Sequence, residues 1–546
     1  MDIHFLGGAT TVTGSRFLLT TARARVLIDC GMFQGSPNES IRNRIPLGFE
    51  PSELDAILLT HAHLDHCGLL PIAVREGFTG PIHATKGTIE LANLVLLDSG
   101  RLHEEFAKRD ARWERRNPDR VAEDDAKQAA HYAAAVDQAA SADAADEAAA
   151  AELANSDRRQ ASEHVPTTVE PTGAAAYPDP EAELRAQPPE LTMDLDAPLY
   201  TEREAGAVGP LFRPVDYDQE IEVGPGVHAT FLEAGHILGS AIIRVRISEE
   251  GAAERYIVFS GDLGRPGTPI IRDPTTLVHA DYVVVESTYG GREHEPHQEA
   301  IRVLAETVRM VAESDGVLLV PSFAIGRTQE IVWELDRLIE RGEIPLLPLY
   351  LDSPMASKAS DIYRHHAEYF DAATRQLLQS EGSPLDYPNQ TITNNIKQSQ
   401  AIERAPRPYM IVASNGMLTG GRVVGHLRNL IDDPAATILF VGYQGKGTLG
   451  SHLQAGAKTV KLDGQVRDVR CQIRSISGFS AHADESELLD WLRNFTTGKR
   501  PGDPGYPRRV FLVHGDPEAQ QALEPKVRQL GFETHIPVWH ERVTLD

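Results

Sequence analysis

Cysteine is scarce in this chain of 546 residues, and its scarcity excludes two architectures. Only Cys30, Cys67 and Cys471 occur, and they are far apart in the sequence. Three scattered thiols cannot supply a disulfide framework or a cysteine zinc cluster. We therefore expect neither, and we assign Cys67 a packing role although it adjoins a histidine-rich segment.

Long apolar runs are also missing. No stretch approaches the roughly 18 residues that cross a bilayer, and the best candidate, Ile344 to Leu351, is interrupted by Pro345 and Pro348. The first residues lack the basic start and apolar core of a secretory signal. At 41% hydrophobic residues, the chain can still bury the cores of two to four domains. We expect a cytoplasmic protein without a membrane partner.

Basic charge is in short supply, since the formal net charge is −26. Such a charge ordinarily argues against nucleic-acid partners, because phosphate binding depends on Lys and Arg. However, residues 104–204 hold 24 acidic and 11 basic side chains, and so carry half of that charge. Within them, residues 117–197 are rich in Ala, Asp, Glu and Pro and too poor in large apolar residues for a core. We interpret 117–197 as a surface insertion outside the domain cores.

The remaining sequence has an α/β pattern. Residues 25–29 and 56–60 are apolar runs that end in polar side chains, as buried strands do when a site lies at their tips. Residues 88–97 have helical apolar spacing. From about 291 to 450, helical segments alternate with apolar strands, which predicts a parallel sheet in a second domain.

The strongest chemical signal is a dense group of histidines directly after one of these strands. His61, His63, Asp65 and His66 lie within six residues. Neutral imidazole and carboxylate are ligands that zinc accepts, and one turn can aim several of them at one point. One loop cannot complete two tetrahedral sites, so further ligands should lie at other strand ends.

Two polar residues at strand tips are candidates for those ligands. His236 follows the apolar run Val227 to Leu232, and Asp262 follows Tyr256 to Phe259. Each has glycine neighbours that allow close approach. Singly, either would be read as a turn residue, but together with the histidine group both are predicted metal ligands.

At this point the sequence resembles the metallo-β-lactamase superfamily. The residues that carry the resemblance follow the order of that family: Asp29, His61, His63, Asp65, His66, His236 and Asp262. The resemblance implies a four-layer αββα sandwich with two zinc ions at one edge. It places one zinc on His61, His63 and His236, a second on Asp65 and His66, and Asp262 between them. It also implies that Asp29 orients the ligand imidazoles.

Later motifs resemble those of the β-CASP nucleases within that superfamily. They are Glu286 to Gly290, Pro321 to Arg327, Asp352 to Met355, Ala413 to Arg422, Gly447 to His452 and Phe479 to His482. The resemblance implies an α/β domain at 291–450 inserted between the two parts of the sandwich, 1–290 and 451–546. It is similar to the compact bacterial RNA-processing form that lacks KH domains, and it also suggests a homodimer.

Matching the motifs residue by residue gives expected roles. Glu286, His452 and His482 match the family motifs A, B and C. We expect His482 to complete the second zinc site, and a histidine there goes with RNA-processing members. A hydroxide between the zinc ions would attack the phosphodiester. His452, oriented by Glu286, would protonate the leaving oxygen, and Asp65 would accept a proton from the water.

Substrate binding is expected from glycine-rich and basic positions of the second domain. The candidates are Arg327, Ser414, Gly416, Gly420 and Gly421. The segment from Ser414 to Arg422 could present backbone N–H groups to phosphates. A tight turn between strand and helix is an equally good interpretation of it.

Other histidines receive lesser roles. We expect His514, which follows the strand-like Val510 to Val513, to be structural or to lie outside the ligand set. His4, His83, His228 and His426 are read as surface or core residues.

Several functional alternatives stay open or are disfavoured. A small-substrate hydrolase would need only a short path from Asp262 to the last ligand, whereas here a whole domain intervenes. A silent RNA-binding scaffold should have lost ligands, and none is missing. A DNA-directed nuclease of the same family is the remaining alternative. The sequence does not distinguish endonucleolytic from 5′ exonucleolytic cleavage.

Overall fold

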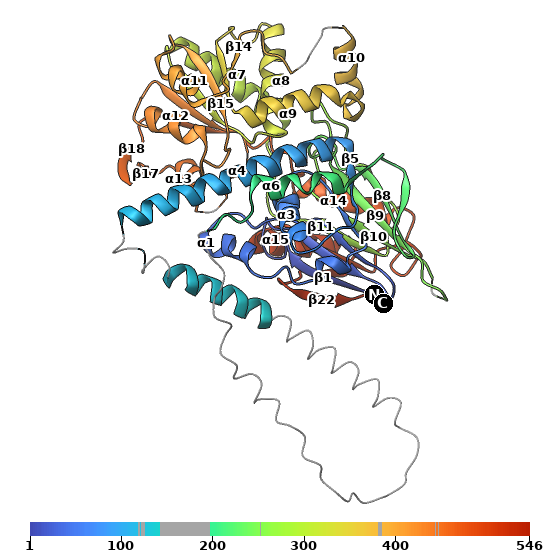
Figure 1. The fold of residues 1–546 in the computed structure, drawn as a ribbon. Coiled ribbons are helices and arrows are strands. Elements are labelled where there is room, and N and C mark those ends of the chain that lie inside the picture. The colour runs from blue at the N-terminus through green and yellow to red at the C-terminus, as the bar shows by residue number, and fades with distance from the viewer. Residues whose placement is uncertain are drawn as a thin grey trace, which may run out of the picture.

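The computed structural model describes residues 1–117, 121, 126–141, 197–251, 253–380, 385–442, 444–445, 447–462 and 464–545. These residues form two units, a sandwich that contains both chain ends and a second α/β unit stacked on it (Figure 1). None of the described helices is long and apolar enough to span a bilayer.

The first sheet of the sandwich combines the N-terminal strands with the last one. Its order is β22 (Glu541–Thr544), β1 (Asp2–Gly7), β2 (Arg16–Thr20), β3 (Arg25–Ile28), β4 (Ala56–Leu58), β5 (Ile82–Thr85) and β6 (Phe212–Val215). Strands β22 to β3 are antiparallel, and β3 to β6 are parallel. The parallel half therefore directs the carboxyl ends of β3 and β4 to one edge of the sheet.

The second sheet faces the first. Its order is β21 (Thr534–His535), β20 (Arg509–Val513), β11 (Tyr282–Glu286), β10 (Arg255–Phe259), β9 (Ala241–Ile247), β8 (Val227–Glu233) and β7 (Glu220–Gly224). The neighbours β10, β11 and β20 run parallel. Residues far apart in the sequence thereby reach one edge of this sheet.

Apolar side chains between the two sheets form the inner core of the sandwich. Phe5 and Val26 of the first sheet pack with Ile243, Val284 and Phe511 of the second. The outer face of the first sheet is covered by α3 (Leu70–Arg75), α4 (Lys86–Arg116) and α6 (Glu202–Gly206), and that of the second by α14 (Glu485–Arg493) and α15 (Pro517–Gln529). This arrangement confirms the predicted four-layer αββα fold.

The second unit is built on a parallel sheet. Its order is β14 (Gln390–Ile392), β13 (Leu349–Asp352), β15 (Tyr409–Ala413), β12 (Val317–Pro321), β16 (Ala436–Phe440) and β19 (Gln472–Ser475). Apolar cores lie on both faces, with α7 (His297–Glu313) and α8 (Arg327–Glu340) on one and α12 (Arg422–Leu430) and α13 (Leu449–Gln454) on the other. Because β19 forms an edge of this sheet, the sheet extends past the boundary that we expected at residue 450.

Short elements complete the described part of the chain. They are α1 (Pro37–Ser40), α2 (Leu64–Cys67), α9 (Pro354–His365), α10 (Ala372–Ser380), α11 (Ile396–Ala401) and the hairpin of β17 (Thr459–Leu462) and β18 (Gln465–Asp468). Single 3₁₀ turns occur at Ile41–Arg44, Pro51–Glu53, Gly209–Leu211, Ala367–Tyr369, Ile402–Arg404 and Asn494–Thr496.

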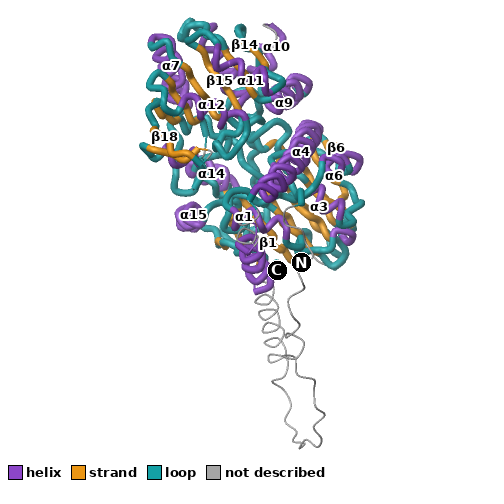
Figure 2. Tube along the Cα trace, turned by 60° about the vertical axis from the view of Figure 1, so that its left-hand side comes forward, coloured by secondary structure: helices purple, strands orange, loops and turns teal. Residues whose placement is uncertain are grey.

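Two features of the fold differ from the sequence-based expectation. The helix expected at 88–97 is the 31-residue α4, capped by the Thr85 side chain, and it runs along the boundary between the two units in both views (Figures 1 and 2). Residues 126–141, placed in a surface insertion, are helical, and Ala135 and Ala139 are buried against Phe33 and Trp539. That part of 117–197 therefore belongs to a packed core, whereas 142–196 lies outside the described residues.

Candidate metal centre

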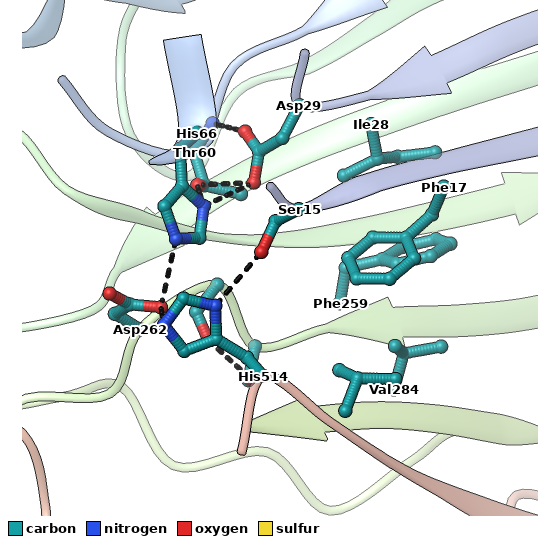
Figure 3. Close-up of a pocket in the computed structure, with 13 residues that line it drawn as sticks. Ser15, Phe17, Ile28, Asp29, Thr60, His66, Phe259, Asp262, Val284 and His514 are labelled. Atoms are coloured by element: carbon teal, nitrogen blue, oxygen red, sulfur yellow. Dashed lines mark hydrogen bonds and ion pairs between the residues drawn. The ribbon is translucent and has the colours of Figure 1, made fainter. Parts of the chain in front are cut away.

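The candidate ligands gather where strands of both sheets end. Asp29 follows β3, His61 follows β4, Asp262 follows β10 and His514 follows β20. Figure 3 shows Asp29, His66, Asp262 and His514 converging at the end of the apolar space between the sheets. Because strand ends from two facing sheets meet there, a rigid scaffold positions each of these side chains.

Asp29 holds the histidine-rich turn in place. Its carboxylate accepts hydrogen bonds from the Thr60 amide and hydroxyl, both at 2.8 Å, and contacts His66 Nδ1 at 2.7 Å. The residue has a positive φ of 58°, a backbone conformation to which aspartate is better suited than most residues. With its Nδ1 engaged, His66 presents Nε2 to the site, as the expected orienting role of Asp29 requires.

A first group consists of His61, His63, His236 and Asp262, whose ligand atoms all lie within 4.8 Å of one another. His63 Nδ1 is 3.1 Å from His61 Nε2 and 3.2 Å from His236 Nε2. Oδ2 of Asp262 is 3.4 Å from His61 Nε2 and 3.6 Å from His236 Nε2. The structure thus brings together the residues predicted for the first zinc.

A second group consists of Asp65, His66 and His514, and it corrects one expectation. We expected His482 to join Asp65 and His66, and His514 to lie outside the ligand set. Instead, Nε2 of His514 is 3.5 Å from Asp262 Oδ1, which is 3.2 Å from His66 Nε2. Ser15 Oγ fixes the His514 ring by a 2.9 Å hydrogen bond to Nδ1.

His482 lies in a third group with Glu286 and Asp262, and this corrects a second expectation. Its Nδ1 is 3.1 Å and 3.2 Å from the two oxygens of Glu286, while its Nε2 is 3.9 Å from Asp262 Oδ2. Glu286 was expected to orient His452. However, His452 is exposed on α13, and none of the described hydrogen bonds or ion pairs joins it to Glu286.

The segment that carries His482 is held from several sides. The Glu286 carboxylate also accepts from the Leu263 amide at 2.6 Å and the Thr288 hydroxyl at 2.6 Å. Arg265 donates to the Gly478 carbonyl at 2.6 Å. Asp484, two residues beyond His482, caps helix α14 through a capping box with Glu487. These contacts fix the His482 imidazole at the rim of the metal centre.

Burial and mutual charge set the protonation of these groups. Burial, then the neighbouring His66, lowers the pKa of His61 well below its usual value, and burial lowers the pKa of His63 to about 4. Burial alone would raise the pKa of Asp262, but the facing imidazoles, His514 first, hold it well below normal. Burial alone would lower the pKa of His482, but Glu286 and Asp262 raise it to about 9. Burial alone would lower the pKa of His66, but Asp262 and Asp29 hold it well above its usual value. An anionic Asp262 beside the neutral imidazoles of His61 and His63 suits a divalent cation.

Two buried atoms show that these residues fit a metal. His66 Nε2 and Asp262 Oδ1 are buried, and neither makes a hydrogen bond in the described structure. The two atoms lie 3.2 Å from each other, but buried polar atoms that make no hydrogen bond gain from a ligand that satisfies them. Each faces the centre of the groups described above, so the donor set is that of a metal site.

Only some of the residues predicted to bind substrate are exposed to solvent. Arg327 is buried and ion-paired with Glu330, so its guanidinium is engaged. Ser414, Gly420 and Gly421 are partly or fully exposed where β15 ends, whereas Gly416 is buried. Gly421 has φ of +81°, and a Cβ there would lie 2.5 Å from the Ser414 carbonyl oxygen. Glycine is therefore required for this turn.

Sequence reasoning missed a buried network beside this turn. Asp352, at the end of β13, contacts His426 Nε2 at 2.6 Å and an Arg422 nitrogen at 2.7 Å. Its oxygens also accept from Ser399, at 2.5 Å, and from Thr393. His426 is thus a satisfied core histidine, as expected. The signal available in the sequence was the position of Asp352 at a strand tip, which also marked Asp262.

Fold and site together define a metal-dependent hydrolase of the metallo-β-lactamase type. Comparisons with family models agree. Residues 10–130 match the metallo-beta-lactamase superfamily, residues 328–453 the Beta-Casp domain, and residues 466–537 the Zn-dependent metallo-hydrolase RNA specificity domain.

Curated relatives match over nearly the whole chain. The sequence is 32% identical to ribonuclease TTHA0252 of Thermus thermophilus, covering 100% of both chains. It is 28% identical to transcription termination factor FttA of Methanosarcina mazei, over 99% of this chain and 71% of that protein. It is also 28% identical to the FttA of Pyrococcus horikoshii, over 97% of this chain and 69% of that protein. The chain belongs to the β-CASP ribonuclease family of metallo-hydrolases.

Proposed function

We propose that the protein hydrolyses phosphodiester bonds of RNA with two zinc ions. The observation that carries the proposal is the division of ligands around Asp262. Its Oδ2 faces His61 and His236, and its Oδ1 faces His66 and His514. A carboxylate that offers one oxygen to each of two ligand groups suits a bridging role between two metal ions.

The ligand assignment follows this division. His61, His63 and His236 would hold one zinc, Asp65, His66 and His514 would hold the other, and Asp262 would contact both. When bound, zinc supplies a Lewis acid that polarises the phosphoryl group and activates water. Among the chain's own groups, the Asp65 carboxylate is proposed to accept a proton from the attacking water.

Proton delivery to the leaving oxygen is assigned to His482 on geometric grounds. The Glu286 carboxylate engages Nδ1 of His482, which leaves Nε2 directed toward Asp262. An imidazole oriented by a carboxylate at the edge of a metal site has the arrangement of a general acid. His452, which lies exposed on a helix of the second unit, lacks such a partner among the described contacts.

The substrate is proposed to enter between the sandwich and the second unit. Gly326, just before α8, would place a Cβ 2.9 Å from Ile237, the neighbour of His236. His236 Nδ1 in turn lies 3.1 Å from the Ala481 carbonyl. The loop after β12 thus reaches the residue next to His236, and ligands of parallel α/β sheets bind at the carboxyl ends of the strands, which supports this route. Ser414, Gly420 and Gly421, at the end of β15, are proposed to contact the RNA backbone.

A cleavage assay with matched substrates tests the proposal. Purified protein is incubated with one sequence as 5′-monophosphate RNA, 5′-triphosphate RNA, circular RNA and single-stranded DNA. Hydrolysis of RNA that is lost in Asp262→Asn is expected. Cutting of the circle would establish endonuclease activity, and dependence on the 5′ end would establish a 5′ exonuclease. Preferential hydrolysis of DNA, or no hydrolysis of any substrate, would contradict it.

A further inference from the structure

The outer half of helix α4 carries an exposed stripe that the metal centre does not explain. Leu102, Phe106, Arg109, Trp113 and Arg116 are spaced by four, three, four and three residues, so they share one face of the helix. All five are exposed, the apolar ones by 37% for Leu102, 44% for Phe106 and 40% for Trp113. We call these five residues the α4 stripe.

Exposed aromatics of this size are unusual on a helix that already has a buried face. The N-terminal half of α4 buries Leu91, Ala92, Val95 and Leu96 against the sandwich. Beyond Gly100 no residue of the helix is buried. The two rings are seven residues apart, which is about 10 Å along the axis. Large apolar groups left in water together indicate a binding surface.

The charge around the stripe identifies its partner as a polyanion. Residues 101–116 hold six basic and four acidic side chains in a chain whose net charge is −26. Among the described residues, no ion pair involves Arg112, Arg115 or Arg116. Basic residues near a helix C-terminus also favour the helix dipole, but that effect does not account for Phe106 and Trp113.

The arrangement of rings and guanidinium groups favours single-stranded nucleic acid over a duplex. The Arg109 guanidinium lies 4.9 Å from the Phe106 ring centroid, and Arg109 also pairs with Asp110 at 3.3 Å. Aromatic faces beside basic side chains are the means by which proteins stack unpaired bases and follow a phosphate backbone. A duplex keeps its base faces stacked within the helix and could not use the rings.

We propose that the α4 stripe is a second contact site for single-stranded RNA, in which Phe106 and Trp113 stack bases and Arg109 and Arg116 contact phosphates. The proposal rests on the proposed ribonuclease function, since it concerns the same substrate. Helix α4 runs along the boundary between the two units (Figures 1 and 2). The stripe would therefore hold a long RNA while another part of the strand occupies the metal centre.

The test measures RNA affinity of the holoenzyme by fluorescence anisotropy. The probe is a labelled phosphorothioate RNA of about 20 nucleotides, which exceeds typical single-strand site sizes and resists cleavage. Phe106→Ala with Trp113→Ala should weaken binding by about tenfold or more. Trp113→Phe, which keeps a ring, should stay within about threefold of the parent. Leu97→Ala is the matched control, because Leu97 is 37% exposed on another face of α4.

Salt dependence separates stacking from phosphate contact. Arg116→Gln should reduce the slope of log affinity against log salt by about 0.7, the value for one phosphate contact to a single strand. The double aromatic variant should keep the parent slope. Its zinc content and thermal melt should match the parent, which shows that lost affinity does not reflect misfolding.

The outcomes distinguish this inference from the proposed function. Suppose that the parent hydrolyses RNA, while the Phe106→Ala/Trp113→Ala double variant and the Arg116→Gln variant bind the probe as the parent does. The stripe assignment is then wrong. If those variants instead change the mass in solution from dimer to monomer, the stripe contacts a second copy of the chain, and the RNA assignment is likewise wrong. If the parent neither binds nor hydrolyses RNA, the proposed function itself fails.

Discussion

At the scale of single residues, Asp262 is the group on which the proposed metal centre depends most. Both of its oxygens are engaged, each toward a different set of imidazoles. Asp262→Ala should therefore lower the zinc content from two per chain to below one, as measured by atomic emission. The control is Asp336→Asn, which alters a buried carboxylate far from the ligand groups in sequence, on α8. This variant should keep both ions. Two zinc ions per chain in Asp262→Ala would refute the bridging role.

His514 and His482 can be told apart by the same measurement. His514→Ala removes a member of the Asp65 and His66 group, so the variant should keep only about one zinc per chain. His482→Ala removes a group that contacts Glu286 instead, and it should keep two. The opposite pattern would return His482 to the ligand set and make His514 an outer residue.

The role of His482 in proton transfer predicts a kinetic signature. His482→Ala should lose cleavage by roughly 10²–10⁴-fold, the usual contribution of general acid catalysis. The loss should shrink for an RNA whose leaving oxygen is replaced by sulfur, because a thiolate leaves without protonation. His452→Ala, at an exposed position of α13, should cleave within about threefold of the parent. An equal loss by His482→Ala on both substrates would exclude the acid role.

The sequence alone predicted most of the residues that meet at the metal site, but it assigned His482 and His514 to the wrong positions. The dense histidine group and the strand tips at His236 and Asp262 identified the first ligand group. His514 follows an apolar strand in the same way, but the motif match predicts His482 as the ligand of the second zinc and a structural role for His514. Which imidazole reaches which carboxylate depends on how β11 and β20 pair, and no local pattern states that pairing.

At the scale of elements, the helix at 126–141 is the clearest departure from expectation. Its alanine-rich sequence indicated an exposed segment, because few large apolar residues were available to bury. Ala135 and Ala139 are nevertheless buried in contact with Phe33 and Trp539, and Arg42 donates to Gln138 at 3.2 Å. Here the large apolar partners come from other elements, so composition of the segment alone was misleading.

This packing predicts a difference between two neighbouring substitutions. Ala135→Asp would bury a carboxylate against Phe33 and Trp539, which is costly without a partner. The melting temperature should fall by about 2–4 °C or more. Ala134→Asp adds the same charge at an exposed position of the same helix and should have little effect. Equal melting of the two variants would show that 126–141 does not stabilise the sandwich.

At the scale of the whole molecule, fold class and layering followed from pattern and resemblance, while the domain boundaries did not. The βα alternation correctly indicated a parallel sheet, but β19 joins that sheet from beyond residue 450. The last strand, β22, pairs with β1, so the two ends of the chain complete one sheet (Figure 1). Such pairings join residues hundreds of positions apart and leave no periodic signal in either segment.

The same arrangement explains why the metal centre is buried yet reachable. Most candidate ligands sit on strand ends of the sandwich, while the second unit meets the His236 loop at Gly326, just before α8. A substrate strand would thus lie between the two units, as proposed above. The central claim is that zinc held at this junction performs the cleavage of RNA.

A zinc titration tests that claim most directly. The protein is stripped with a chelator and given back zinc in steps, and bound metal and RNA cleavage are measured on the same samples. Cleavage should be absent from the stripped protein and should rise to a plateau at two zinc ions per chain. Cleavage by the stripped protein, or none after two ions have bound, would contradict the account.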